Sequence, residues 1–295
     1  MVWDNGSAAM QILVDDESIK LRVDVFAAKQ YPELSRSSIQ RLLSDNKILV
    51  NEKPVKNNYR LKAGDKVDIN YDSDIDNIVP TIDIPILYED DDCVVINKPA
   101  GLLSHSKGAF NPEATVATWL STRFSGMGGE RVGIVHRLDR ATSGVMICAK
   151  TPEATTWLQK QFSTRKVTKH YMAIVDGVIE PEEAIIDIPI GRNPKEPSTF
   201  RTDINGKPAV THYKVLKAND NLSLVDLKPE TGRTHQLRVH LNYLGHSIVG
   251  DSLYGGIKAD RMYLHALSLD IVLPDKQRQH FEAPLPKEFN IKMGA

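Results

Sequence analysis

The chain is poor in the features that define several common classes of protein. Only two of its 295 residues are cysteines, Cys93 and Cys148, and each lies inside an apolar run. No Cys-x-x-Cys pair is present, which argues against a thiolate zinc site and a disulfide framework. We therefore predict that both cysteines are small buried hydrophobic residues in a reducing compartment.

Signals for export and for membrane insertion are also missing. The first residues, Met1 to Asn5, contain no basic segment followed by an apolar one. No apolar run approaches the roughly 20 residues that a membrane-spanning helix needs. We therefore expect a soluble cytoplasmic protein.

Net charge is almost absent, because 37 Lys and Arg oppose 38 Asp and Glu. Any signal for nucleic-acid binding must therefore be local. Residues 20–70 contain eleven Lys or Arg against six Asp or Glu, a net charge of +5, whereas residues 71–92 contain eight acidic residues and no basic one. This switch in charge, followed by Pro80 and Pro85, predicts a domain boundary.

The length of the chain predicts one small and one large domain. The expected parts are an N-terminal extension (1–19), a small basic α+β domain (20–70), an acidic linker (71–84) and a large domain (85–295). In the large domain, short apolar runs alternate irregularly with helical stretches at 115–124, 153–162 and 234–244. This pattern predicts an α+β fold on a large mixed sheet.

The small domain is expected to carry a basic face. Ser35 is a predicted helix N-cap, and Ile39 and Leu42 lie on the apolar side of the helix that follows. The cations on this helix and on the strand region after it are Arg36, Arg41, Lys47 and Lys53. They are either a solvated surface without function or a set of contacts to a phosphate backbone.

A dense polar segment, residues 136–144, interrupts two apolar runs of the large domain. Asp139 lies between Arg137 and Arg140, and Thr142, Ser143 and Gly144 follow directly. One explanation is a local ion pair followed by a turn. The other is a set of reactive groups on a loop that rigid elements hold in place.

A second polar segment follows about a hundred residues later and has matching chemistry. Thr234 is the predicted N-cap of a helix that places Leu237 on its buried face. Arg238 lies near the same face, and a buried arginine needs a carboxylate. Asp139 is the expected partner, and such a pair would keep Asp139 ionised, as a nucleophile or a base requires.

Two smaller polar clusters accompany these segments. Lys98 and His105 flank a Pro-Gly turn, which on its own indicates only a surface turn. Lys166 and Lys169 precede Tyr171, and an aromatic residue beside cations suits base stacking with phosphate contact, or else is a core residue beside solvated charges. No His-x-x-x-His or His-x-His pair and no Gly-rich phosphate loop is present, so we expect neither a metal nor a nucleotide cofactor.

Taken in order, these motifs resemble those of the RluA/RluD-type RNA pseudouridine synthases. The matching segments are 97–104, 136–139 with 142–144, Lys169 with Tyr171, and 231–240, followed in the tail by 244–246, 249–251, 253–255, 264–266 and 281–284. The small domain resembles the RNA-binding domain named after ribosomal small-subunit protein four, which the RluC/RluD branch carries. That likeness rests on 22–26, 34–37, 40–43, 48–51 and 63–65.

The resemblance implies a fold, a reaction and residue roles. The fold is that of the pseudouridine synthases, with a mainly antiparallel sheet, and the family needs no cofactor. The reaction isomerises uridine within RNA: the glycosidic bond to nitrogen 1 breaks, the base rotates and a bond forms through carbon 5. Asp139 matches the catalytic aspartate, Tyr171 the tyrosine that stacks under the uracil, and Arg238 the basic partner of the aspartate. Arg137 matches the arginine that fills the stack vacated by the flipped base, and Leu237 the aliphatic residue beside it.

Further residues are expected to bind substrate or to mark departures from the family. The remaining expected substrate contacts are His136, Arg233, His235, Gln236 and Lys98. Asn46 and Glu52 stand where the small domain often has glycine, and Ala141 stands where many relatives have aspartate. The Gly-rich stretch 124–130 is expected to be mobile.

The leading hypothesis is a monomeric RNA pseudouridine synthase that acts on large-subunit ribosomal RNA or its assembly intermediates. The alternatives are a synthase that acts on transfer RNA and a non-catalytic RNA-binding factor for ribosome assembly. A hydrolase based on Asp and His is a weaker candidate, because the chain has neither a nucleophile elbow nor paired carboxylates.

Overall fold

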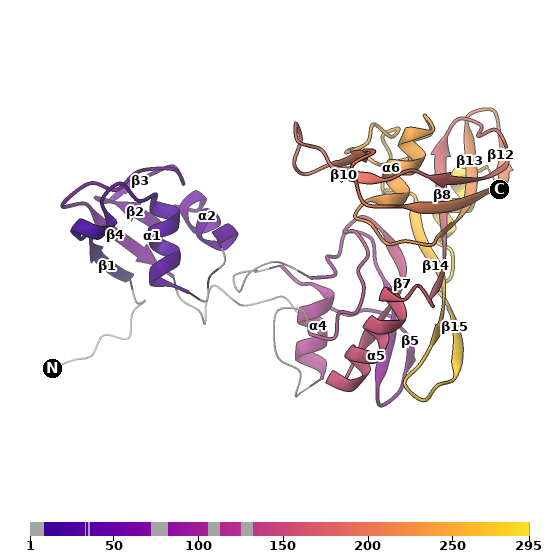
Figure 1. The fold of residues 1–295 in the computed structure, drawn as a ribbon, viewed down its shortest axis with the longest axis horizontal. Coiled ribbons are helices and arrows are strands. Elements are labelled where there is room, and N and C mark those ends of the chain that lie inside the picture. Colours follow the sequence, from indigo (N-terminus) through magenta and orange to yellow (C-terminus); the bar gives the residue numbers. More distant parts are fainter. Residues whose placement is uncertain are drawn as a thin grey trace. The chain divides into compact units, whose positions relative to one another are not determined.

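A computed structural model describes residues 9–32, 34, 36–71, 82–105, 113–124 and 132–294. The chain forms two compact units, Met1–Ile82 with His105–Trp119, and Asp83–Ser104 with Leu120–Ala295 (Figure 1). Ser35, most of the acidic linker and nearly all of the stretch 124–130 lie outside the described residues. No described helix is long and apolar enough to span a membrane.

Residues 9–71 of the N-terminal unit, as far as they are described, combine two α-helices with a four-stranded antiparallel sheet of order β1-β4-β2-β3. Its elements are β1 (Ala9–Leu13), a 3-10 turn (Asp16–Ser18), α1 (Val23–Gln30), α2 (Arg36–Ser44), β2 (Ile48–Val50), β3 (Lys53–Pro54) and β4 (Lys66–Asn70). Phe26, Ile39 and Leu42 of the helices share one core with Ile48 and Ile69 of the strands. Strand β1 lies in the segment predicted to be an extension, so the sheet of this unit begins before residue 20.

Two turns in this unit place residues other than glycine in the left-handed region of the backbone. Asn46 has a φ of 56° and Glu52 a φ of 63°, both in the left-handed region. Asparagine visits this region with little strain, whereas glutamate does so less readily. Glu52 therefore keeps a backbone geometry that glycine usually supplies.

The larger unit is built on a nine-stranded mixed sheet of order β5-β6-β7-β14-β8-β13-β12-β9, with β15 beside β14. The strands are β5 (Ile86–Glu89), β6 (Cys93–Lys98), β7 (Ser143–Ala149), β8 (Thr168–Asp176), β9 (Glu183–Asp187), β12 (Val210–Ala218), β13 (Leu222–Pro229), β14 (Leu264–Val272) and β15 (Arg278–Glu282). Strands β7 and β14 run parallel, and the other neighbouring pairs described run antiparallel. The predicted α+β fold on a mixed, mainly antiparallel sheet is confirmed.

Helices and one small hairpin complete the described elements. They are α4 (Val116–Arg123), α5 (Pro152–Ser163), α6 (Gln236–Tyr243), α7 (Lys287–Lys292) and the hairpin of β10 (Ile190–Arg192) with β11 (Phe200–Thr202). The first three of these helices were predicted from the sequence to within two residues at each end. Cys93 and Cys148 are free and buried, as predicted.

The register of the central strands determines where the polar segments meet. Gly144 of β7 pairs with Ala266 of β14, Ala266 pairs with Tyr171 of β8, and Tyr171 pairs with Leu227 of β13. These four residues therefore form one row across the sheet. The loop that carries Asp139 leads directly into this row, and the turn before α6 follows β13.

Candidate active site

A pocket of about 120 Å³ lies where the two polar segments meet. The loop before β7 supplies Arg137 and Asp139 to its lining, β8 supplies Tyr171, and α6 supplies Leu237 and Arg238. Asp139 and Arg238, which are 99 residues apart in the chain, come within hydrogen-bonding distance there. Reactive side chains from a loop, a strand and a helix of the larger unit thus surround a single cavity, which is the usual arrangement of an enzyme site.

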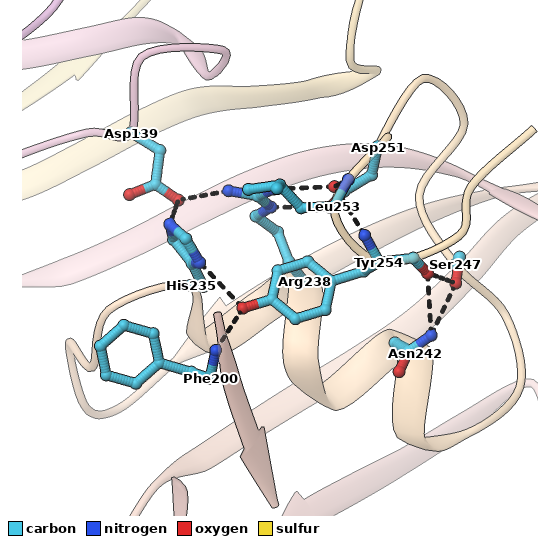
Figure 2. A network of polar contacts seen from close by, with 9 residues as sticks. All are labelled: Asp139, Phe200, His235, Arg238, Asn242, Ser247, Asp251, Leu253 and Tyr254. Atoms are coloured by element: carbon cyan, nitrogen blue, oxygen red, sulfur yellow. Dashed lines mark hydrogen bonds and ion pairs between the residues drawn. The ribbon is translucent and has the colours of Figure 1, made fainter. Parts of the chain in front are cut away.

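Asp139 contacts Arg238, but the strongest partner of Arg238 is a different carboxylate (Figure 2). Its Nη1 donates to Asp139 Oδ2 over 3.4 Å, whereas its Nε and Nη2 each donate to Asp251 over 2.7 Å. The predicted pair of Asp139 and Arg238 therefore exists as the longer arm of a three-membered cluster. The prediction missed Asp251, which is only 1% exposed and occupies two of the three donor nitrogens of the guanidinium.

His235 faces Asp139 from the turn before α6. Its Nε2 lies 3.8 Å from Asp139 Oδ2, and its Nδ1 lies 2.8 Å from the Tyr254 hydroxyl. Burial, partly opposed by the charge of Asp139, lowers the pKa of His235. The ring is therefore mainly neutral at pH 7.

The predicted N-cap at Thr234 is wrong. Helix α6 begins at Gln236, and His235 is its N-cap with a φ of 57° and no side-chain capping bond. The side chain of Gln236 holds the start of the helix in place of a capping bond. Its Oε1 accepts from Thr231 Oγ1 over 2.7 Å and from the Arg233 amide over 3.0 Å. His235, at this left-handed cap, lines the pocket.

Gln236 lines the pocket, but its polar atoms are engaged within the protein. Besides the two bonds to Oε1, its Nε2 donates to the Val210 carbonyl and to Thr211 Oγ1 over 2.9 and 3.0 Å. An amide side chain has two donors and one acceptor oxygen with two lone pairs, and all are used. Gln236 therefore fixes the turn between β13 and α6, and its contact with substrate stays a prediction.

Lys98 likewise makes its hydrogen bonds within the protein and does not line the pocket. It has no exposed surface, and its Nζ donates to the carbonyls of Pro99, Leu102 and Arg140 over 2.9, 2.7 and 3.3 Å. Burial, partly opposed by the charge of Asp139, lowers the pKa of Lys98 to about 7. Lys98 therefore ties the turn after β6 to the loop of Asp139, and its contact with substrate stays a prediction.

Hydrogen bonds of two further kinds hold the loop of Asp139. Ser104 Oγ donates to the Leu138 carbonyl over 2.7 Å and accepts from its amide over 3.1 Å. The Gly101 amide donates to the Arg140 carbonyl over 2.8 Å. The backbone on both sides of Asp139 is therefore fixed, and a rigid loop of this kind can hold a reactive carboxylate in one place.

His136 supports the loop from its other end and is not part of the pocket lining. Its ring stacks on Phe162 with centroids 4.4 Å apart, and its Nε2 accepts from the Ile147 amide over 3.1 Å. The acceptor nitrogen of His136 is thus bonded to β7, and its contact with substrate stays a prediction. Burial, with the charge of Lys169 adding to it, lowers the pKa of His136 to about 3.

The neutral His136 makes the stability of the fold depend on pH. An unfolded chain takes up the proton near the ordinary pKa of 6.5, whereas the folded protein resists it down to about 3. The stabilisation is complete above pH 6.5 and is lost as the pH falls toward 3. The free energy of unfolding, measured with denaturant at pH 7 and pH 4.5, should therefore fall more in the wild type than in His136→Asn. An equal fall in both would contradict this assignment.

The remaining predicted residues keep positions that suit contact with a ligand. Arg137 is exposed and lines the pocket, and Arg233 lines it while its Nε donates to the Pro208 carbonyl over 3.0 Å. Lys169 donates to the Thr231 carbonyl over 3.3 Å. Burial raises the pKa of Tyr171, and the charge of Asp139 adds to the effect. Its hydroxyl therefore keeps its proton at neutral pH.

In the N-terminal unit, the described cations lie at the surface. Arg41 is half exposed and lies 3.5 Å from Asp45, Lys47 is partly exposed and Lys53 is exposed. The side chain of Arg36 lies outside the described residues.

The described residues of both units include no group of three His, Cys, Asp or Glu side chains arranged to hold a metal ion.

Comparison with known proteins identifies the class of protein that this fold and site define. The model of the RNA pseudouridylate synthase family matches residues 92–243, and the S4 domain model matches residues 21–67. The chain therefore belongs to the RNA pseudouridylate synthase family, which is a family of enzymes.

Relatives match over almost the whole length of the chain. An RNA pseudouridine synthase of Bacillus subtilis, YlyB, described as uncharacterized, is 36% identical over 95% of both chains. The ribosomal large subunit pseudouridine synthase D of Escherichia coli K12 is 35% identical, covering 93% of this chain and 90% of the relative. The solved structure of human RNA pseudouridylate synthase domain containing 1 is 34% identical, with a TM-score of 0.59 over 70% of this chain and 85% of that one. The predicted family and fold are thus confirmed.

Proposed function

We propose that this protein isomerises specific uridines of large-subunit ribosomal RNA to pseudouridine in the cytoplasm, with Asp139 as the catalytic residue. The observation that carries the proposal is that Asp139 lines one pocket together with Arg238 and Tyr171 in a member of this family. The ribosomal substrate is supported by the relative of Escherichia coli whose name assigns it to the large ribosomal subunit.

The pocket supplies the groups that the isomerisation needs. Chemistry on a stacked base requires the nucleotide to be extruded into a pocket, which costs a few kcal/mol. The Tyr171 ring and Leu237 line the cavity and offer an apolar surface for a planar base. Asp139 then meets the sugar or the base as the bond to nitrogen 1 breaks, and Arg238 balances its charge. The protonated hydroxyl of Tyr171 is available for proton transfer at carbon 5.

Release of tritium from carbon 5 of uridine tests the proposal directly. A synthase removes that hydrogen when carbon 5 bonds to the sugar, so labelled ribosomal RNA should lose tritium in proportion to pseudouridine formed. A non-catalytic RNA-binding factor would bind the RNA and release none. A synthase for transfer RNA would release tritium from labelled transfer RNA alone.

We further propose that Arg137 fills the stack that the flipped base leaves. Its side chain is exposed at the pocket, and a planar guanidinium can stack on bases and still contact phosphate. Arg137→Ala should lower kcat on structured RNA by about 100-fold, because stacking on a base and contact with phosphate are together worth about 2–3 kcal/mol. The loss should shrink on a short single-stranded RNA, where there is little stack to open. Arg140→Ala, on the same loop, is the matched control, and equal losses in the two variants would contradict a specific role for Arg137.

We also propose that Arg36, Arg41, Lys47 and Lys53 of the N-terminal unit contact the RNA backbone. Replacing Arg41, Lys47 and Lys53 together with glutamine should weaken RNA affinity and reduce the slope of log K against log salt by about 2 to 3, since each phosphate contact contributes about 0.7–0.9. The affinity for RNA, measured at several salt concentrations between about 50 and 200 mM, gives this slope for the wild type and the variant. A slope equal to that of the wild type would show that the basic face is only solvated.

A further inference from the structure

The turn from Asp251 to Tyr254 lies directly behind both groups that face Asp139 (Figure 2). Asp251 bonds to Arg238, and Tyr254 bonds to His235. Neither residue of the turn lines the pocket, so neither is placed to touch a base. Their contacts with the pocket residues therefore act on Asp139 only through Arg238 and His235.

Asp251 selects which edge of the guanidinium faces Asp139. It takes the edge formed by Nε and Nη2, with both distances at 2.7 Å, and leaves Nη1 for Asp139. The backbone of the same turn holds the side chain of Asp251, because Asp251 Oδ1 accepts from the amides of Leu253 and Tyr254 over 3.1 and 3.3 Å. The centroid of the Tyr254 ring also lies 4.9 Å from the guanidinium carbon of Arg238. Arg238 is thus fixed before any substrate arrives.

The Tyr254 hydroxyl links His235 to a backbone amide. The Phe200 amide donates to the Tyr254 hydroxyl oxygen over 2.9 Å, which leaves the hydroxyl proton available for donation to His235 Nδ1 at 2.8 Å. An Nδ1 that accepts leaves the ring hydrogen on Nε2, and a carboxylate such as Asp139 only accepts. The chain of donors therefore runs from Phe200 through Tyr254 and His235 toward Asp139.

The turn is anchored on the helix that carries Arg238 and on the segment that follows this helix. Asn242 Nδ2 of α6 and Ser247 Oγ after it donate to the Tyr254 carbonyl over 2.9 and 2.6 Å. Gly250 and Gly256 flank the turn, and a Cβ at these positions would lie 1.8 Å from the Arg261 carbonyl oxygen and 2.0 Å from that of Ile248. Since no real Cβ comes so close to backbone, both glycines are required for this path of the chain.

We propose that the turn from Asp251 to Tyr254 is a positioning element for the reaction, in which Asp251 sets the orientation of Arg238 and Tyr254 sets the Nε2–H tautomer of His235. The inference rests on the proposed function for its effect on turnover. The geometry of the turn itself can be tested without any RNA.

The first test measures the tautomer of His235 by 15N NMR of the full-length protein labelled at histidine nitrogens. We expect the Nε2–H tautomer in the wild type, with a bare and hydrogen-bonded Nδ1. Tyr254→Phe should shift the Nδ1 signal, whereas Tyr263→Phe removes the hydroxyl that donates to Asp260 and should leave it unchanged. An Nδ1–H tautomer in the wild type, or no shift in Tyr254→Phe, would overturn the role of Tyr254.

The second test measures kcat and KM for pseudouridine formation. Asp251→Asn should lower kcat by about 100-fold, as expected for loss of hydrogen bonds to a charged group, and Tyr254→Phe by about tenfold, as for a neutral hydrogen bond. KM should stay within about twofold, because neither residue contacts RNA. Asp251→Glu should recover part of the loss, since it restores the carboxylate. Asp270→Asn, which removes a carboxylate that pairs with His280 at the surface, is the control and should keep full activity.

The outcomes separate the inference from the function on which it rests. If the wild type forms no pseudouridine in any RNA, the proposed function fails, and the NMR measurement still decides the role of Tyr254. If the wild type is active, a normal kcat in Asp251→Asn overturns the role of Asp251. A loss that appears only in KM, or that Asp251→Glu does not recover at all, overturns it as well.

Discussion

Asp139→Asn should abolish pseudouridine formation, with a fall in rate of at least about 10⁴-fold, the scale seen when an essential catalytic group is removed. The amide keeps the size of the side chain and can still accept from Arg238 Nη1, so the pocket should keep its shape. It lacks the negative charge that an attack or a proton abstraction requires. RNA binding should survive, because the basic residues at the pocket and in the N-terminal unit are unchanged.

Two measurements check this expectation together. Tritium release from labelled ribosomal RNA gives the rate, and filter binding or anisotropy gives the affinity for the same RNA. Asp226→Asn is the matched control and should retain activity. It replaces a carboxylate of β13 that pairs with His170 of β8. Substantial turnover by Asp139→Asn would show that another group carries the chemistry, whereas a parallel loss of binding would show that the variant damages the RNA site.

Gly144→Ala should unfold the larger unit or destabilise it by at least about 4 kcal/mol, which is at the upper end for a single substitution. Gly144 has a φ of +112°, and a Cβ there would lie 2.1 Å from the Ala266 carbonyl oxygen. The overlap cannot relax easily, because Gly144 and Ala266 are paired in the parallel contact of β7 and β14. The same row of the sheet carries Tyr171, so any shift also disturbs the pocket.

Gly245→Ala provides the control for this prediction. Gly245 also has a positive φ, +86°, but nothing lies within 4 Å of the position of its Cβ. Its substitution should cost only about 1 kcal/mol, the usual penalty for a left-handed residue that is not glycine. The free energy of unfolding, measured with denaturant, should show backbone strain alone in Gly245→Ala and backbone strain plus steric overlap in Gly144→Ala. Similar losses in both would contradict the role given to the parallel strand pair.

Much of the fold could be predicted because periodicity and local turn signals specify it. The helices near residues 115–124, 153–162 and 234–244 have regular apolar faces, and the structure contains all three. The parallel pairing of β7 with β14 could not be predicted, since it joins segments more than a hundred residues apart that carry no sign of their register. In the larger unit, strands β9, β10, β11, β14 and β15 were also missed. Strands β10 and β11 have only three residues each, which is too little pattern to be recognised.

The site shows the same division between local and distant information. The sequence indicated that Arg238 needs a carboxylate, and the structure provides two. Which carboxylate takes the stronger bonds depends on the edge of the guanidinium that each one faces, and sequence spacing does not report this. The segment 249–251 was noted among the tail motifs, but nothing in it distinguished Asp251 from other acidic residues.

Three residues with predicted substrate contacts form hydrogen bonds within the protein that the sequence did not reveal. Lys98, His136 and Gln236 have side chains that suit RNA, and they lie in the right motifs. Whether such a group is free to bind depends on how many of its donors and acceptors the protein already uses. For Lys98, three carbonyls meet the ammonium group, a count that only the folded chain reveals.

The central claim is that this protein makes pseudouridine in large-subunit ribosomal RNA, and mapping pseudouridines in cells tests it most directly. Large-subunit RNA should be compared from the wild-type strain, from a strain that lacks the gene, and from the deletion strain that carries either the wild-type gene or Asp139→Asn. The account predicts that one or more pseudouridines disappear in the deletion strain and return only with the wild-type gene. An unchanged set of pseudouridines in the ribosomal RNA of the deletion strain would contradict it.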